Sequence, residues 1–391
     1  MNFKKLLSTV AVASMLVACG GGSTESNESK AFKIGVSGPL TGDAAVYGNA
    51  VKNAAELAVE EVNAKGGIQL ELKVEDDQAD PEKSPTAYGT LKDWGMQIGL
   101  STVTSGAAAA VSQNYADDQI FALTPSASST TVIYKDADNT QSFGYVYQMC
   151  FTDPNQGIAS ADYIKAHTNL GTKVAVIYKS DDNYSTGVYQ KFMSEAKAKG
   201  LEVVSETSFD NSSATDFNVQ LKDAQAKGAD IVYLPIYYQP ASLILTQASK
   251  MGYKPSFFGI DGMDGILTLK GFDTKLAEGV YLLTPFSADA KDDLTANFVK
   301  NYKAKCDGEV PNQFAADAYD CIYAIYNALE AGKATPDMSN SEIADILKKQ
   351  FTSMTFNGLT GTDVTWSEKG EVSKAPKAVV IKDGAYVGVE D

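Results

Sequence analysis

The sequence contains no arginine. All 33 basic residues among its 391 positions are lysine, 49 acidic residues outnumber them, and the formal net charge is −16. A bound carboxylate or phosphate would therefore have to be held by hydroxyl groups, backbone amides or a lysine rather than by a guanidinium fork. A surface with so large an excess of negative charge also repels nucleic acid. We expect no nucleic-acid partner, and any anion site must be built without arginine.

Histidine is almost as scarce. The one histidine, His167, lies in a helix-like segment and is expected to be a solvated surface residue. With one histidine, the sequence has too few suitable side chains to favour a histidine-based catalytic triad or a zinc site. The serines that could act as nucleophiles, Ser105 and Ser128, lie in no Gly-x-Ser-x-Gly or Ser-x-x-Lys pattern, and no phosphate-binding glycine motif follows a strand. We expect a protein that is not an enzyme and that carries no metal and no cofactor.

Long apolar runs are confined to the N-terminus. Residues 6–18 are mostly apolar, follow two lysines, and are too few to span a bilayer as a permanent helix. The run ends in Leu-Val-Ala-Cys at 16–19, which resembles the end of a lipoprotein signal peptide. The resemblance implies that residues 1–18 are removed, that Cys19 becomes the acylated N-terminus, and that the rest lies outside the cytoplasm. The alternative is an ordinary secretory signal with Cys19 unmodified.

Residues 20–29 consist of Gly, Ser, Thr, Asn and Glu, which predicts a flexible tether over 19–30. Three cysteines remain beyond it: Cys150, Cys306 and Cys321. Cys306 and Cys321 flank a single loop between two helical segments, so they are the pair expected to form a disulfide if any does. Free, buried thiols are the alternative.

Beyond the tether, strand-like and helix-like segments alternate. Strands are predicted at 32–36, 70–74, 98–102, 120–124, 173–178, 201–205 and 231–234, and helices at 48–65, from 80, and at 106–117, 187–199 and 217–227. This alternation predicts an α/β architecture with parallel sheets, and the roughly 360 residues suffice for two lobes. The turns after the strands are rich in Ser, Thr, Gly and Tyr, and open α/β sheets bind ligands at such turns.

Several strings, taken in order, resemble the leucine/isoleucine/valine-binding proteins of ABC importers, which are type I solute-binding proteins. They are SGPLTG at 37–42, VNAKGGI at 62–68, DDQADP at 76–81, TSG at 104–106, TPSAS at 124–128, FTDPNQG at 151–157 and FAADAYD at 314–320. The resemblance implies two Rossmann-like lobes that are joined by three hinge crossings and close on a ligand.

We expect lobe 1 to comprise residues 31–148 and 286–356, and lobe 2 to comprise 149–285 and 357–391. Turn-prone residues place the crossings near 147–153, 284–287 and 355–358.

The resemblance also implies a set of ligand contacts. Ser105, at a helix start that favours an anion, would bind an α-carboxylate, and Ser128 would add a hydroxyl and an amide. The Ser126 carbonyl and the Asp261 carboxylate would hold the α-ammonium group. For Ser105 the alternative is a simple helix cap, and for Asp261 a turn beside glycine.

Aromatic walls would come from Tyr47, Tyr184 and Tyr237, for which packing in the core is the alternative. The sequence departs from the family where Ala79 and Thr104 replace a pair of bridged cysteines, and where serine stands at Ser128 in place of a frequent threonine.

These observations predict a lipid-anchored, extracytoplasmic, monomeric protein that binds a free amino acid and delivers it to the permease and ATPases of an ABC importer. No arginine is available to bind a second carboxylate, so a neutral amino acid is favoured, with branched aliphatic ones first. Selectivity would come from residues near Thr41, Tyr47, Phe151 and Met263. The alternative is an amino-acid or amide sensor that hands its closed form to a signalling partner.

Overall fold

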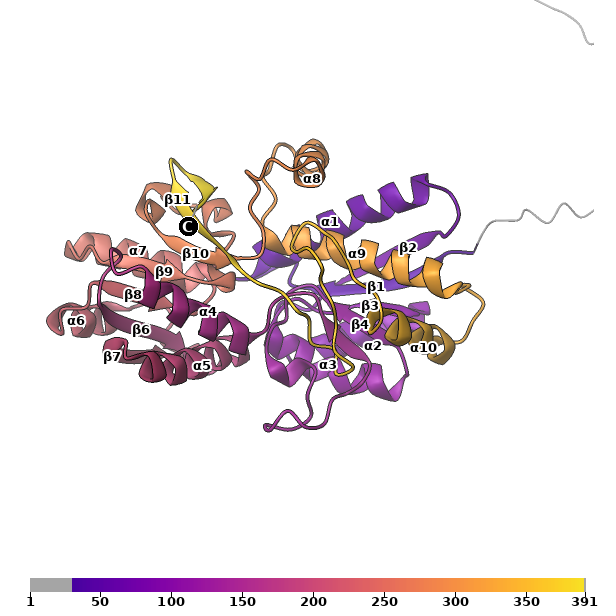
Figure 1. Cartoon of the computed structure of the whole chain (residues 1–391), viewed down its shortest axis with the longest axis horizontal. Helices are drawn as coiled ribbons and strands as arrows, with labels where there is room; N and C mark the ends of the chain where they lie inside the picture. The colour runs from indigo at the N-terminus through magenta and orange to yellow at the C-terminus, as the bar shows by residue number, and fades with distance from the viewer. Residues whose placement is uncertain (1–29, 390–391) are drawn as a thin grey trace, which may run out of the picture.

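The computed structural model describes residues 30–389, so the predicted signal peptide and Cys19 lie outside the described residues. Two α/β lobes, each with its own sheet, lie next to each other along the long axis of the molecule (Figure 1). The expected two-lobed α/β architecture with mainly parallel sheets is therefore confirmed. No helix in the described part of the chain is long and apolar enough to cross a membrane.

The first lobe contains a fully parallel five-stranded sheet in the order β2-β1-β3-β4-β5. Its strands are β1 (Phe32–Gly38), β2 (Leu70–Asp76), β3 (Ile98–Leu100), β4 (Phe121–Thr124) and β5 (Val146–Gln148). All but β2 are almost entirely buried, as expected of strands covered by helices on both faces.

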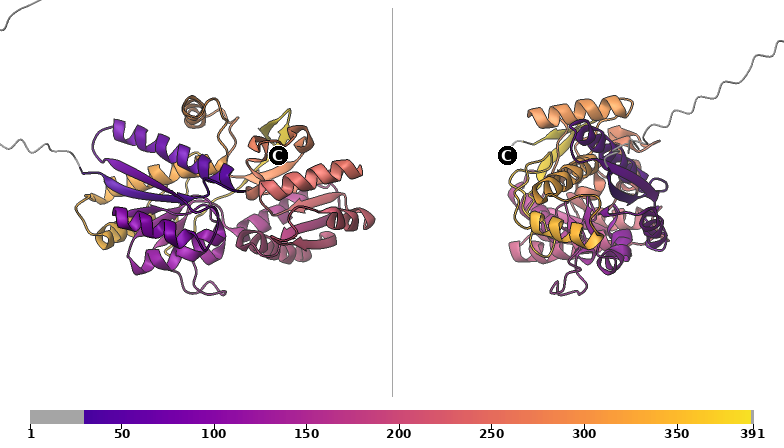
Figure 2. Two further views of the ribbon diagram at one scale, coloured as in Figure 1. Left: turned by 180° about the vertical axis from the view of Figure 1, so that it is seen from behind. Right: turned by 90° about the vertical axis from the view of Figure 1, so that its right-hand side faces the viewer.

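The helices of this lobe are α1 (Ala45–Ala64), α2 (Ser84–Trp94), α3 (Ser105–Asp117), α8 (Asp293–Lys305), α9 (Gln313–Gly332) and α10 (Asn340–Phe351). α1 and α9 pack against each other on one side of the sheet, and α2 and α3 lie on the other (Figure 1). α8 lies outside α1, away from the sheet (Figure 2).

The second lobe contains a seven-stranded sheet in the order β12-β11-β10-β9-β8-β6-β7. Its strands are β6 (Lys173–Lys179), β7 (Glu202–Phe209), β8 (Ile231–Leu234), β9 (Ser256–Gly259), β10 (Tyr281–Thr284), β11 (Lys377–Lys382) and β12 (Ala385–Gly388). The last two form an antiparallel hairpin on the edge of a parallel sheet. The helices are α4 (Asp153–Ala166), α5 (Asn183–Lys199), α6 (Asn218–Ala226) and α7 (Tyr238–Met251).

Helix caps fix the elements that face the other lobe. Thr152 caps α4 through the Asn155 amide at 3.5 Å, directly after the chain leaves β5, and Pro154 occupies the first turn. Asp182 caps α5 through the Ser185 amide at 2.8 Å. Both helices begin at the boundary between the lobes: the Asp153 amide of α4 donates a hydrogen bond to the Ser128 carbonyl at 3.0 Å, and the Asn183 side chain of α5 donates one to the Thr131 hydroxyl at 3.3 Å.

The third crossing differs from the predicted position. The Trp366 indole donates a hydrogen bond to the Gln148 carbonyl at 2.8 Å, and its ring lies 4.8 Å from the Phe351 ring on α10. The Gln148 amide in turn donates to the Gly370 carbonyl at 3.0 Å. Residues 357–373 therefore stay with the first lobe. The chain crosses just before β11 rather than near 355–358, because the tryptophan is buried against the first lobe's core.

Of the two alternatives for Cys306 and Cys321, the structure has free thiols: Cys321 is buried within α9, whereas Cys306 is half-buried at the C-terminal end of α8. His167 is less exposed than expected, because it is half-buried and its ring stacks on that of Tyr163 with 3.8 Å between the centroids.

Candidate ligand-binding site between the lobes

Six of the seven predicted ligand-binding residues line one pocket at the junction of the two lobes. They are Tyr47, Ser105, Ser126, Tyr184, Tyr237 and Asp261. Ser128, the seventh, does not reach the lining, although it is buried in the same turn after β4. The cavity measures about 10 Å³, close to the room that one water molecule needs. The lobes must therefore separate before a molecule the size of an amino acid can enter.

The first lobe contributes the start of α3. Ser105 is the first residue of this helix rather than its cap, and the cap residue, Thr104, makes no side-chain hydrogen bond to it. The Ser105 hydroxyl instead accepts a hydrogen bond from the Ser129 amide at 3.2 Å. The positive end of the α3 dipole therefore lies at the pocket, which suits an anionic group.

The second lobe contributes Asp261, in the turn after β9. Its side chain is almost completely buried, and among residues 30–389 its carboxylate accepts only one hydrogen bond, at 3.5 Å from the Gln156 amide nitrogen. Burial raises the pKa of Asp261 well above its usual value, the charges of Asp317 and Asp264 raise it further, and Gln156 and Lys374 lower it. A cationic group placed beside this carboxylate would replace the solvation that it has lost.

Three tyrosines form the walls. The Tyr47 ring meets that of Tyr237 edge-on at 5.5 Å, and Tyr184 stacks on Tyr237 at 5.3 Å. The Tyr184 hydroxyl accepts a hydrogen bond from the Gly262 amide at 2.9 Å, and the Tyr47 hydroxyl donates one to the Gly262 carbonyl. Burial raises the pKa of all three phenols well above 10. They are therefore neutral donors and acceptors at physiological pH.

The sequence interpretation missed four lining residues: Val103, Thr104, Gly262 and Phe314. Phe314 opens the FAADAYD string on α9 and packs on Tyr47 with 4.3 Å between the ring centroids. The Thr104 hydroxyl is buried and finds no hydrogen-bond partner among the described residues. Val103, Thr104 and Gly262 lie within two positions of Ser105 or Asp261, and this closeness in sequence could have indicated them. Phe314 is distant in sequence from all of the predicted ligand contacts.

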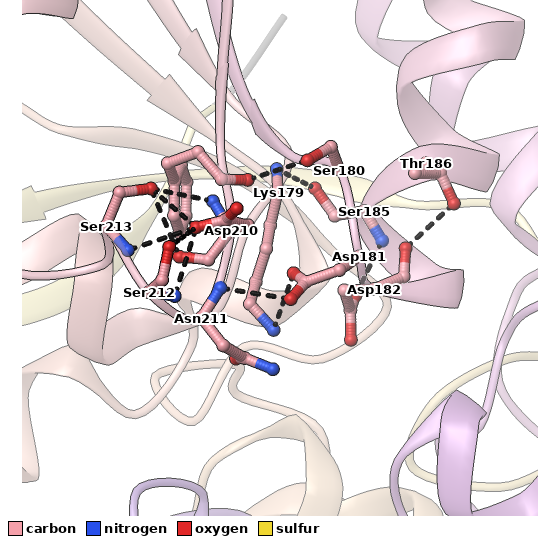
Figure 3. Close-up of polar contacts among 11 residues, drawn as sticks. Lys179, Ser180, Asp181, Asp182, Ser185, Thr186, Asp210, Asn211, Ser212 and Ser213 are labelled. Carbon is pink, nitrogen blue, oxygen red and sulfur yellow. Dashed lines mark hydrogen bonds and ion pairs between the residues drawn. The ribbon is translucent and has the colours of Figure 1, made fainter.

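Hydrogen bonds brace the loop that leads from β6 into α5, the helix that carries Tyr184 (Figure 3). The Lys179 amide donates to the Ser185 hydroxyl at 2.8 Å, and the Asn211 amide in the loop after β7 donates to Asp181 at 3.0 Å. The Asp210 carboxylate accepts from Ser212 and Ser213 in the same loop. These bonds hold the start of α5 in place, and from there Asn183 reaches across to the Thr131 hydroxyl of the first lobe at 3.3 Å.

The buried charges around the pocket are almost all negative. Asp153 is buried and Asp182 half-buried at the starts of α4 and α5, and desolvation raises the pKa of both carboxyls. In the part of the chain that the structure describes, no group of three or more acidic, cysteine or histidine side chains could hold a metal ion. The arrangement can bind a zwitterion, with its anionic end at α3 and its cationic end at Asp261.

Known proteins that resemble this chain in sequence and in structure indicate which family it belongs to. The profile of the family described as periplasmic binding protein covers residues 31–385. This chain is a member of the periplasmic binding protein family. The Leu/Ile/Val-binding protein homolog 3 of Brucella melitensis is 28% identical to this binding protein over 403 residues, with 100% of both chains covered.

Solved structures agree with the family assignment. The branched-chain amino acid transporter substrate binding protein LivJ of Streptococcus pneumoniae, in complex with isoleucine, superposes on this binding protein with a TM-score of 0.80 and 26% identity, covering 91% of this chain and 98% of the other. A solute binding protein of an R. palustris ABC transporter, in complex with benzoate, gives a TM-score of 0.79 at 19% identity, with 92% and 96% covered. The second likeness concerns the fold alone.

Proposed function

We propose that this periplasmic binding protein captures a neutral amino acid between its lobes and delivers it to the permease of an ABC importer, with branched aliphatic amino acids as the preferred class. The observation that carries the proposal is the pairing, in one pocket, of the α3 N-terminus at Ser105 with the buried carboxylate of Asp261. An α-carboxylate and an α-ammonium group would satisfy the two ends together.

The remaining lining favours an apolar side chain. Val103 and Phe314 are buried at the pocket, and the Tyr47 ring packs between the lobes beside them. Among residues 30–389 no lysine lines the pocket, so a second carboxylate on the ligand would have no cation there to pair with. The isoleucine complex of the Streptococcus pneumoniae relative supports the same ligand class.

An aromatic acid such as benzoate fits less well. It carries a carboxylate but no ammonium group, so it would leave Asp261 buried without a counter-charge. The two negative charges would then lie in one poorly solvated pocket and would repel each other.

A thermal-shift screen tests this proposal. The protein is heated with each of the common amino acids, with small amides and with benzoate. A ligand at 100 times its dissociation constant adds about 2.7 kcal/mol to stability, so leucine, isoleucine or valine is expected to raise the melting temperature clearly. Stabilisation by benzoate with no response to any amino acid would contradict the proposal.

We also propose that Cys19, outside the described residues, carries lipid and keeps the protein at the outer face of the bacterial membrane. The string at 16–19 and the polar stretch that follows it support this anchoring. Cys19→Ala is expected to abolish acylation and to release the protein from the membrane fraction. An unmodified Cys19 peptide in the mass spectrum of the wild-type protein would contradict it.

A further inference from the structure

One lysine side chain is buried at the third crossing. The Lys374 ammonium lies 2.7 Å from a carboxylate oxygen of Asp317, and the two side chains are 0% and 1% exposed. Lys374 also donates a hydrogen bond to the Thr360 hydroxyl at 2.6 Å. Among the described residues it is the only basic residue that the fold buries. A buried ion pair costs much desolvation, so its presence at this position needs an explanation.

Asp317 belongs to a stripe of polar residues along α9. Gln313, Asp317 and Asp320 are spaced by four and three positions and so face the same side of the helix. The Gln313 side chain donates a hydrogen bond to the Asp261 backbone carbonyl at 2.9 Å, and the Gln313 backbone amide donates one to the Asp264 carboxylate at 2.9 Å. One face of α9 therefore contacts the loop of the second lobe that carries the proposed ammonium-binding acid.

Further along the same face, α9 holds the chain that leads to the third crossing. The Asp320 carboxylate accepts hydrogen bonds from the Leu359 amide at 2.8 Å and from the Thr360 amide at 2.9 Å. Lys374 ends this held segment, because only Ala375 and Pro376 separate it from β11 in the second lobe's sheet. The part of the third crossing that is free to bend is thus short, and it begins where the ion pair ends.

The pair also acts on the charge of the pocket. The negative charge of Asp317 raises the pKa of Asp261, and the positive charge of Lys374 lowers it. Lys374 therefore offsets the effect of a buried carboxylate on its neighbour. Without the lysine, Asp261 would face an uncompensated negative charge.

We propose that Lys374 and Asp317 form an ionic clasp that fixes the third crossing to α9, keeps the α9 contact that Gln313 makes with the Asp261 loop in place, and so sets ligand affinity without touching the ligand. This inference rests on the proposed function, because it takes the ligand to present an ammonium group to Asp261. Lys374 and Asp317 are positioning residues in this scheme. A purely structural ion pair would affect unfolding but would leave the affinity of the folded protein unchanged.

The test uses the full chain with leucine as the probe. Lys374→Met removes the cation and leaves Asp317 unpaired, while Asp317→Asn/Lys374→Met removes both charges and leaves no buried charge of the pair without a partner. Lys305→Met is the matched control. Lys305, the last residue of α8, forms a more exposed ion pair with Glu60 of α1 at 2.6 Å, away from the crossings. Calorimetry gives the dissociation constant, urea unfolding gives the stability, and small-angle scattering gives the ligand-free radius of gyration.

Lys374→Met is expected to weaken leucine binding at least about tenfold, and the double variant about fivefold, with Lys305→Met within twofold of the wild type. The double variant is also expected to have a larger ligand-free radius of gyration, because its third crossing is no longer held. If either variant fails to fold, Asp317→Asn, which keeps the shape of the side chain, replaces it in the test. This variant is then expected to weaken leucine binding about fivefold.

Leucine affinities within twofold of the wild type in the folded variants would overturn the clasp, whatever their stability. If the wild type itself binds no amino acid, the proposed function fails. The clasp is then decided by the radius of gyration alone, and an unchanged value in the double variant refutes it.

Discussion

The Tyr47 hydroxyl on α1 donates a hydrogen bond to the Gly262 carbonyl of the opposite lobe, and it accepts one from the Tyr238 amide at 3.3 Å. A single phenol of the first lobe thus satisfies two backbone groups of the second at the edge of the pocket. These bonds exist only while the lobes are together, so Tyr47 stabilises the closed form relative to the open one.

Tyr47→Phe is expected to weaken ligand binding by about fivefold, since a net hydrogen bond contributes about 1 kcal/mol and 1.4 kcal/mol is tenfold. Tyr253→Phe is the control, because the Tyr253 hydroxyl donates to the Ala229 carbonyl at 2.7 Å within one lobe. The control should lose stability but keep its affinity in calorimetry. Equal affinity in the wild type and in Tyr47→Phe would show that the cross-lobe bonds do not favour closure.

The two ends of the ligand should differ in sensitivity. Asp261→Asn removes the only charged partner proposed for the ammonium group, and hydrogen bonds to charged groups contribute about 1.5–3 kcal/mol, so affinity should fall at least about tenfold. Ser105→Ala removes one hydroxyl while the amides of α3 remain, which should cost about 1 kcal/mol. Calorimetry with the best amino acid compares the two. Near-zero losses in both would place the pocket elsewhere.

Gly262 leaves no room for a side chain. An added Cβ would lie 2.8 Å from both the Ile236 carbonyl oxygen and the Tyr184 ring, so Gly262→Ala should displace the tyrosine wall and lose most ligand affinity. Gly106→Ala is the matched change in α3, where nothing lies within 4 Å of the new Cβ.

Gly106→Ala should raise the free energy of unfolding by about 0.4–1 kcal/mol, because alanine is favoured over glycine in a helix. Urea unfolding and calorimetry on both variants separate the two effects. Unimpaired binding in Gly262→Ala would mean that the ligand does not use this wall.

Asp317 should make stability depend on pH. Burial raises its pKa from 3.8 to about 6, against the opposing charge of Lys374. The folded form then binds the proton more tightly than the unfolded chain does. The stability that Asp317 contributes is present in full below pH 3.8 and is lost as the pH rises through about 6.

Unfolding in urea between pH 4 and 7 checks this against Asp317→Asn. The difference in unfolding free energy, wild type minus variant, should grow as the pH falls and level off near 4. Asp136→Asn provides the opposite sign, since hydrogen bonds from Thr140 and Gln141 lower the pKa of Asp136 and its contribution is lost as the pH falls. A pH-independent difference for Asp317→Asn would mean that its carboxyl titrates alike in both states.

Much of the fold could be predicted because its signals are local. Buried strands such as β8 (Ile231–Leu234) are short apolar runs, and helices such as α5 end at a glycine in the left-handed conformation, Gly200. Ser105 and Ser126 follow such strands, and parallel strands bring their carboxyl ends to one edge. The family resemblance added Asp261 and the three tyrosines, and these six residues line one pocket.

What escaped the sequence depends on contacts between distant segments. The third crossing is placed by the bond between Trp366 and Gln148, which are 218 positions apart. Nothing in the sequence near Cys306 or Cys321 indicates that Cys321 is buried within α9 while Cys306 is half-buried at the end of α8. Ser128 has the right residue type and turn but falls short of the lining, because a turn fixes the position of a backbone and not the direction of each side chain.

The same bond between Trp366 and Gln148 gives the molecule a built-in optical reporter. The chain has two tryptophans, and Trp366 lies where the first and third crossings run together, whereas Trp94 lies in the first lobe with the Lys33 ammonium 5.1 Å from its ring. Because residues 357–373 stay with the first lobe, the Trp366 indole senses whether the segment that precedes the third crossing remains packed on that lobe's core. A Trp94→Phe protein would therefore emit light from Trp366 only, and its fluorescence would follow any detachment of this segment in real time without an attached dye.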